Sequence, residues 1–185
     1  MIQEEEPYRE LDGIIFDGSV YYKISGFHLG GSDTLRFSVL ITENCNVIGC
    51  YTDSNDDTNF SLYSTTSTTA RYLRHGSYVR RGGMQLNKRY DAVITPTGFT
   101  GLRYSDTWPE EEFTSPADMC IGTTTETGTS AFLHGTIYGR IIVDDRETFI
   151  PVERRSDGAI GYLGMNSKTF FQNLGSGTPA EYIEA

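Results

Sequence analysis

The 185-residue chain has little of what several common protein classes require. It contains no apolar run of 18 residues, so no segment is typical of a transmembrane helix. Only 15 lysine and arginine residues stand against 25 aspartate and glutamate residues, which gives a formal net charge of −10. Because phosphate backbones and anionic lipid surfaces repel an acidic protein, this charge argues against nucleic acid and membranes as partners.

Cysteine and histidine are also scarce, with three residues of each. Cys45, Cys50 and Cys120 form no CxxC pair, and the histidines are far apart in sequence, so the pattern provides no zinc framework. A bridge between the first two cysteines would need a turn between them, because a single strand puts them on opposite faces. We expect three buried free thiols, and neither a metal nor another cofactor.

The N-terminal segment MIQEEEPYRE is acidic where a secretory signal peptide needs positive charge followed by an apolar run. The sequence therefore gives no support for secretion by a standard signal. We expect a short acidic tail at residues 1–7, a single domain at 8–178 and a C-terminal tail at 179–185, since one all-β domain can reach about 200 residues.

Residues typical of strands and turns are abundant. The chain has 12 Tyr, 10 Phe and 20 Gly, and Thr and Ser occur throughout. Residues 34–42 (TLRFSVLIT) alternate between apolar and polar, and residues 136–144 (TIYGRIIVD) form the longest strand candidate. No apolar stripe of helical spacing persists for three turns. The pattern predicts an all-β fold, an antiparallel sandwich or barrel.

Motifs near both ends of the chain resemble one family of β-sandwich domains. The opening motifs are residues 8–12 (YRELD) and 20–24 (VYYKI). The closing motifs are residues 135–144 (GTIYGRIIVD), 148–152 (TFIPV), 158–163 (GAIGYL), 168–171 (KTFF) and 175–178 (GSGT). In order and spacing they are similar to concanavalin A-like (laminin-G-like) jelly-roll domains, which occur in tailed-phage virion proteins and gut-bacterial surface proteins. Two departures are Glu153, where the family has Cys, and residues 144–147 (DDRE), where it has an Asn-Gly turn.

The resemblance implies a two-sheet antiparallel jelly-roll sandwich, concanavalin A-like, whose first and last strands pair and whose termini are close together. It implies a virion location and a non-enzymatic structural role, as a capsid-decorating or tail-associated protein of a tailed phage. The partners would then be other capsid or tail proteins. The alternative is a carbohydrate-binding lectin module that mediates attachment to host or surface glycans.

Some domains with this sandwich hydrolyse β-glucans, a reaction that needs two carboxylates about 5–5.5 Å apart. One strand can present them at positions i and i+4, but the sequence has no ExDxE motif. Residues 110–112 and the acidic residues of 144–147 are expected in solvated loops or turns. No GxSxG nucleophile elbow occurs. We therefore predict that the protein is not an enzyme.

Segment 53–57 (DSNDD) resembles a calcium loop in composition only. It lacks the Gly and Glu that an EF-hand requires at its sixth and twelfth positions. We interpret it as an acidic turn, and the resemblance leaves open a calcium ion at the rim of the sandwich.

Tyr104, Asp106 and Trp108 are the best local set for a sugar. Apolar faces of sugar rings stack on aromatic rings, while hydroxyl groups need directed polar partners such as a carboxylate. Trp108 is the only tryptophan of the chain and precedes a proline, which indicates a loop. The same residue would equally serve as a protein contact or as a plug of the core.

The only basic stretch of the chain consists of Arg71, Arg74, Arg80 and Arg81. With Tyr72 and Tyr78 between them, these arginines are candidates for contact with an acidic partner surface. The alternative is that the aliphatic stems of the arginines lie along the exposed face of a sheet.

Overall fold

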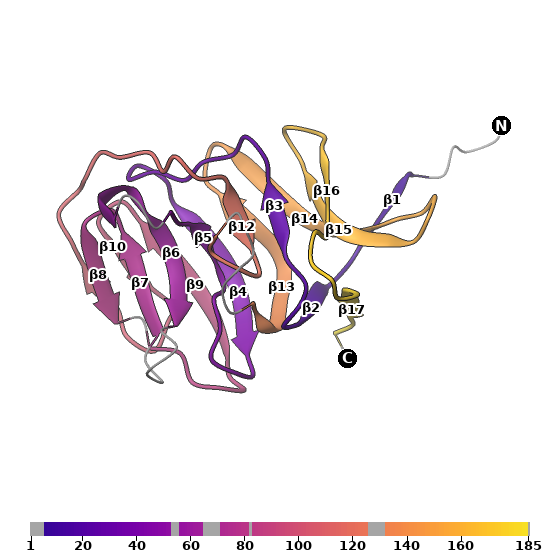
Figure 1. The fold of residues 1–185 in the computed structure, drawn as a ribbon, viewed down its shortest axis with the longest axis horizontal. Helices are drawn as coiled ribbons and strands as arrows, with labels where there is room; N and C mark the ends of the chain where they lie inside the picture. Colours follow the sequence, from indigo (N-terminus) through magenta and orange to yellow (C-terminus); the bar gives the residue numbers. More distant parts are fainter. Residues whose placement is uncertain (1–5, 53–55, 65–70, 82, 126–131, 185) are drawn as a thin grey trace.

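The computed structural model describes residues 6–52, 56–64, 71–81, 83–125 and 132–184 (Figure 1). The fold is all-β with two antiparallel sheets, which confirms the predicted fold class. Within these residues there is no α-helix, and the one helical element is the 3-10 turn η1 (Asp56–Thr58). No helix of the described part is long and apolar enough to cross a membrane.

The larger sheet has eleven strands. Its main path runs in the order β11 (Asp106–Thr107), β10 (Gly98–Thr100), β9 (Arg89–Thr95), β4 (Leu35–Ile41), β13 (His134–Val143), β14 (Glu147–Arg154), β15 (Ala159–Gly164) and β16 (Phe170–Gln172). The other strands of this sheet are β1 (Tyr8–Glu10), β2 (Gly13–Asp17) and β17 (Ala180–Tyr182).

The smaller sheet has six strands. Their order is β3 (Tyr22–Ile24), β12 (Met119–Ile121), β5 (Ile48–Cys50), β6 (Phe60–Ser64), β7 (Arg71–His75) and β8 (Tyr78–Arg81). At one side of the sandwich the edge strand β8 of the smaller sheet lies near the edge strand β11 of the larger sheet. At the opposite side, β3 of the smaller sheet lies near β16 of the larger sheet.

Strand β4 shows how the alternating sequence builds the core. Leu35, Phe37, Val39 and Ile41 are buried, and Arg36 between them is exposed. Buried side chains of both sheets join in one hydrophobic cluster. Since each buried Leu, Ile or Phe contributes about 1.5–3 kcal/mol, this cluster holds the two layers together.

The N-terminal strands fill a fork in the larger sheet. β13 and β14 pair only near the turn that joins them. β2 pairs with the first half of β13, and β1 pairs with the last part of β14. Between these two strands Leu11 donates its N–H to the Pro151 carbonyl at 2.9 Å, and Gly139 donates to the Asp12 carbonyl at 2.7 Å. Gly139 has a φ of 56° at an irregularity in the β13–β4 register, a conformation that favours glycine.

The two ends of the domain meet beside this fork. β17 pairs with β2, and Arg9 on β1 forms ion pairs with Glu153 at 2.5 Å and Glu181 at 2.7 Å. The expectation that the first and last strands pair with each other is wrong, because β1 pairs with β14 and β2 pairs with β17. β17 also lies within residues 179–185, which the sequence suggested as a tail.

Cys45, Cys50 and Cys120 are buried free thiols, as predicted. Burial raises the pKa of the Cys50 thiol far above its usual value. Burial therefore disfavours the thiolate, which is the reactive form of cysteine.

Candidate functional site

The predicted sugar-binding residues lie at the side of the sandwich where β8 and β11 are the edges. Trp108 is only 4% exposed, and its indole N–H donates to the Pro96 carbonyl at 2.9 Å. Asp106 forms an ion pair with Arg80 at 3.2 Å, while Tyr104 is exposed. Trp108 is therefore the core plug that the sequence left open as an alternative, and its ring offers no face to a sugar.

Trp108 belongs to an aromatic stack between the two sheets. Its ring stacks on His75, with centroids 4.8 Å apart, and on Phe99 at 5.8 Å. Phe113 meets the His75 ring edge-on at 5.0 Å. His75 is fully buried, and neither ring nitrogen has a hydrogen-bond partner within the described residues. Desolvation by burial lowers the pKa of His75 below its usual value, because burial penalises the charged form of the ring.

Of the four predicted arginines, Arg74 and Arg80 lie on opposite faces of the smaller sheet, because Arg80 is the cross-strand partner of Leu73, the neighbour of Arg74. Arg80 pairs with Asp106 of the other sheet, so the structure brings together one residue from each predicted set. Arg74 lies on β7, two positions after Tyr72 and therefore on the same face of the sheet. The side chains of Arg71 and Arg81 are outside the described residues.

A groove opens at the opposite side of the sandwich, between edge strands β3 and β16, which lie side by side in Figure 1. We call it the edge groove; it encloses about 420 Å³. Its apolar lining consists of Ile24, Phe27, Phe149, Phe170, Phe171 and Leu174. Its polar lining consists of Lys23, Ser25, Glu147, Ser167, Thr169 and Gln172.

Hydrogen bonds join the two sheets at one end of the edge groove. Leu174 donates its N–H to the Tyr21 carbonyl at 2.9 Å, and the Asn173 side chain accepts the Tyr21 N–H at 3.0 Å. Among the described strands, β3 pairs only with β12 and β16 pairs only with β15. β3 and β16 are therefore edge strands, and they flank the groove on its two sides. An edge strand presents backbone groups that can pair with an added chain.

A buried carboxylate organises the loop next to β16. Glu147 is 5% exposed and accepts the backbone N–H groups of Thr148 at 2.9 Å, Asn166 at 2.7 Å and Ser167 at 2.9 Å. Burial alone would raise the pKa of Glu147, but these hydrogen bonds lower it below its usual value. The expectation of a solvated acidic turn is therefore wrong for Glu147, because it turns inward to bind the loop backbone.

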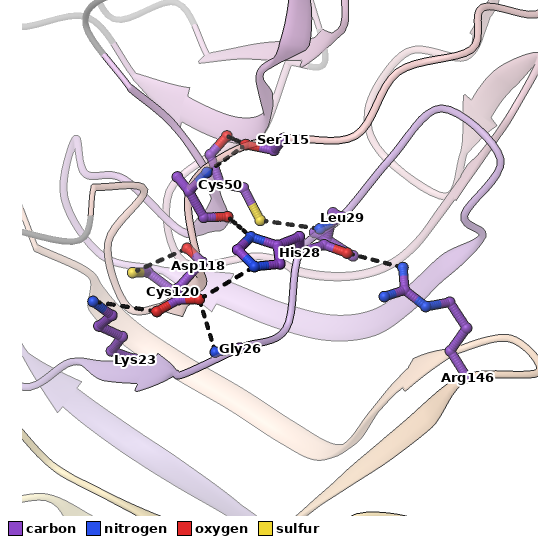
Figure 2. A network of polar contacts seen from close by, with 10 residues as sticks. Lys23, Gly26, His28, Leu29, Cys50, Ser115, Asp118, Cys120 and Arg146 are labelled. Carbon is purple, nitrogen blue, oxygen red and sulfur yellow. Dashed lines mark hydrogen bonds and ion pairs between the residues drawn. The ribbon is translucent and has the colours of Figure 1, made fainter.

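A polar network supports the β3 wall of the edge groove (Figure 2). Asp118 is its centre: it accepts the Gly26 N–H at 2.8 Å and pairs with the Lys23 ammonium at 3.2 Å. The Nε2 atom of His28 lies 3.7 Å from the same carboxylate, and its Nδ1 is 2.9 Å from the Ala117 carbonyl. Together these contacts fix the turn that follows β3.

Arg146 ties the larger sheet to the same turn. Its guanidinium donates to the His28 carbonyl at 2.9 Å and to the Asp33 carboxylate at 2.5 Å. It also lies 4.5 Å from the centre of the Phe27 ring. Asp33 is buried and accepts the Gly30 N–H at 2.7 Å. These contacts hold Phe27 in place at the edge groove. A side chain that is already ordered loses less conformational entropy when a ligand binds.

The edge groove offers apolar contact and backbone pairing. In the ranges that the structure describes, no three His, Cys, Asp or Glu side chains are grouped so that they could hold a metal ion. Residues 53–55 of the acidic turn considered for calcium lie outside these ranges.

Comparison with known proteins gives no assignment. No protein-family model matches the chain, and no curated protein matches it significantly.

Proposed function

We propose that the chain is a non-catalytic structural protein of a tailed-phage particle, a capsid-decorating or tail-associated protein with a concanavalin A-like jelly-roll fold. The terminal motifs at residues 8–24 and 135–178 support this proposal through their resemblance to such domains. The observation that carries it is the edge groove, a preorganised apolar site between two sheet edges.

Such a groove suits an extended segment of a neighbouring capsid or tail protein. In strand addition, main-chain hydrogen bonds to a sheet edge give affinity, and alternate side chains of the added segment enter pockets. Apolar contact adds about 25 cal/mol for each Å² removed from water. Phe27, Phe170 and Phe171 provide that contact here.

The test compares particles assembled with the wild-type chain and with two variants. Leu174 lines the edge groove and is 50% exposed, whereas Ile183 is 70% exposed and is not a lining residue. We expect mass spectrometry of purified particles to find the wild-type chain and Ile183→Asp in stoichiometric amount. Leu174→Asp should be depleted at least about tenfold, since 1.4 kcal/mol of lost binding has that effect.

Absence of the wild-type chain from particles would overturn the proposal as a whole. Equal incorporation of Leu174→Asp and Ile183→Asp would show that the edge groove is not the attachment site. Circular dichroism of both isolated variants serves as the folding control.

Glycan binding is the second candidate function. Tyr104, Asp106 and Trp108 do not form a platform for it, because Trp108 is buried and Asp106 is paired with Arg80. The observation that favours it is an aromatic pair on the smaller sheet: Tyr63 on β6 and Tyr72 on β7 are half-buried cross-strand partners with ring centroids 6.1 Å apart.

A further inference from the structure

The acidic tail of residues 1–7 joins the folded domain next to the edge groove. Tyr8, the first residue of β1, stacks on Phe170 with ring centroids 5.7 Å apart, and Phe170 lines the groove. The Pro7 carbonyl accepts the Arg155 N–H at 3.0 Å, at the turn that joins β14 to β15. Figure 1 shows β1, this turn and β16 in the same half of the molecule. The tail is therefore attached at the end of the sandwich where the groove lies.

The direction of β1 leads away from the groove of the same molecule. Tyr8 is paired with Arg154, the last residue of β14, and Pro7 lies beside Arg155 in the turn that follows. Traced from Tyr8 back to Pro7, the chain therefore runs to the end of the sheet. Entry into its own groove would require a reversal of direction, which entry into the groove of a facing copy does not. Six extended residues span about 20 Å, so part of the tail can bridge to that copy while the rest pairs with the three residues of β16.

Backbone groups of β16 point into the edge groove. The Thr169 carbonyl, just before β16, accepts the Gly164 N–H of β15 at 2.9 Å. Residues of an antiparallel strand direct their N–H and C=O groups alternately to one neighbouring strand and to the other. Phe170 and Gln172 therefore direct theirs away from β15, toward the groove. An added strand finds donors and acceptors there.

The sequence of the tail fits the lining of the groove. It reads MIQEEEP, so two apolar residues precede three glutamates. The apolar residues match the phenylalanine rings that form one part of the lining. The glutamates match Lys168, an exposed cation between the lining residues Ser167 and Thr169. Apolar contact and opposite charge thus both favour this segment as the occupant.

We propose that the edge groove of one copy binds the tail of a second copy, so that two copies exchange tails in a symmetric dimer. This partner rests on the proposed function, since it identifies the neighbouring protein whose extended segment enters the groove. The tail adds a strand beside β16, with Ile2 against the phenylalanine rings and a glutamate near Lys168. Because the two contacts are identical, the dimer gains both for a single loss of translational and rotational freedom.

Sedimentation velocity of the full chain over about a hundredfold range of concentration tests the dimer. We expect a monomer–dimer equilibrium for the wild-type chain. Ile2→Asp in the tail and Leu174→Asp in the groove should each weaken dimerisation about a hundredfold, because a loss of about tenfold occurs at both contacts. Ile183→Asp is the matched control, since Ile183 is exposed and does not line the groove, and it should dimerise like the wild-type chain. Circular dichroism confirms that the variants are folded.

A mixture of the two variants separates tail exchange from any other contact between copies. Ile2→Asp keeps an intact groove and Leu174→Asp keeps an intact tail, so a mixed dimer retains one of the two contacts. Dimerisation should therefore be about tenfold stronger in the mixture than in either variant alone. The absence of this gain would overturn tail exchange, and so would a wild-type chain that is monomeric at all concentrations.

Tail exchange and the proposed function fail in different ways. A monomeric wild-type chain that still enters particles, with Leu174→Asp depleted from them, would show that the groove takes a segment of another particle protein. That result would overturn tail exchange alone. Tail exchange in solution without the wild-type chain in particles would overturn the particle role and leave the dimer standing.

Discussion

The two sides of the sandwich differ in how the edges of the sheets are packed. We call the side of β8 and β11 the closed side and the side of β3 and β16 the open side. At the side of β8 and β11, Trp108 and His75 stack between the sheets, and the Arg80–Asp106 ion pair links their edges. At the side of β3 and β16, hydrogen bonds join the sheets at Leu174 and Tyr21 and again at Arg146 and His28, and the edge groove remains. The difference shows that aromatic residues in a loop can close one side of a core, while a groove remains at the side where the two sheet edges are not packed against each other.

The largest effect is expected from removal of the closing ring. Trp108→Ala should lower the free energy of unfolding by about 3–5 kcal/mol, because it leaves a cavity in the aromatic stack. Leu174→Ala, at the half-exposed residue of the edge groove, should cost less than about 1 kcal/mol. Urea denaturation monitored by circular dichroism measures both. Similar values for the two variants would mean that the two sides do not differ in packing.

A smaller loss is expected from the loop carboxylate at the open side. Glu147→Ala leaves three backbone N–H groups without their acceptor, which should cost about 1–3 kcal/mol. The lowered pKa adds a pH dependence: the stabilisation is complete above the unfolded-state value of 4.5 and is lost as the pH falls through the folded-state pKa. Denaturation between pH 3 and pH 7 tests this, with Glu147→Gln expected to flatten the acid limb. An unchanged limb would contradict the assigned role.

The contribution of His75, on the closed side, to the free energy of unfolding should change with pH in a higher range than the contribution of Glu147. The pKa of His75 is lowered from 6.5 in the folded protein, so the unfolded chain takes up the proton first as the pH falls. Stability is therefore full above pH 6.5 and declines below it until the folded-state pKa is reached. His75→Phe, which keeps an aromatic ring beside Trp108, should remove this decline while leaving the dependence on Glu147. Melting temperatures of the wild-type chain and of His75→Phe, measured from pH 5 to pH 8, test this prediction. An equal decline in both proteins would contradict it.

The smallest effect is expected at the ion pair of the closed side. Both Arg80 and Asp106 are substantially exposed, and pairs of that kind contribute about 0–1 kcal/mol. Arg80→Gln should accordingly change the urea midpoint little, and still less at high salt. A loss comparable to that of Trp108→Ala would show that charge, and not aromatic stacking, closes this side.

The all-β class and several strands were predictable from the sequence, because they follow from the alternation of apolar and polar residues that are neighbours in the chain. The alternation in residues 34–42 became β4, and residues 136–144 fall almost entirely within β13. The prediction of these two strands was correct because an apolar–polar alternation with a period of two depends only on residues that are close in sequence. The pairing of β1 with β14 was not predictable, since it depends on which distant strand leaves an edge free.

The sites were harder to predict, for a physical reason. Trp108 lies in an irregular segment, where no periodicity distinguishes a buried ring from an exposed one. The edge groove combines Phe27 with Phe171, which are far apart in sequence and meet only through the packing of the sheets. Tyr63 and Tyr72 also required the β6–β7 register before they could be recognised as neighbours. The one local signal was the aromatic pair in KTFF at residues 168–171.

The fork filled by β1 and β2 bears on how the chain reaches its native state. Both strands are synthesised early, yet their partners β13, β14 and β17 come more than a hundred residues later. The middle of the larger sheet therefore cannot be assembled until nearly the whole polypeptide has emerged, and its first segment must wait with open strand edges. Folding should consequently be slow and finish with the insertion of that segment, which would make this step the point most exposed to misassembly between copies.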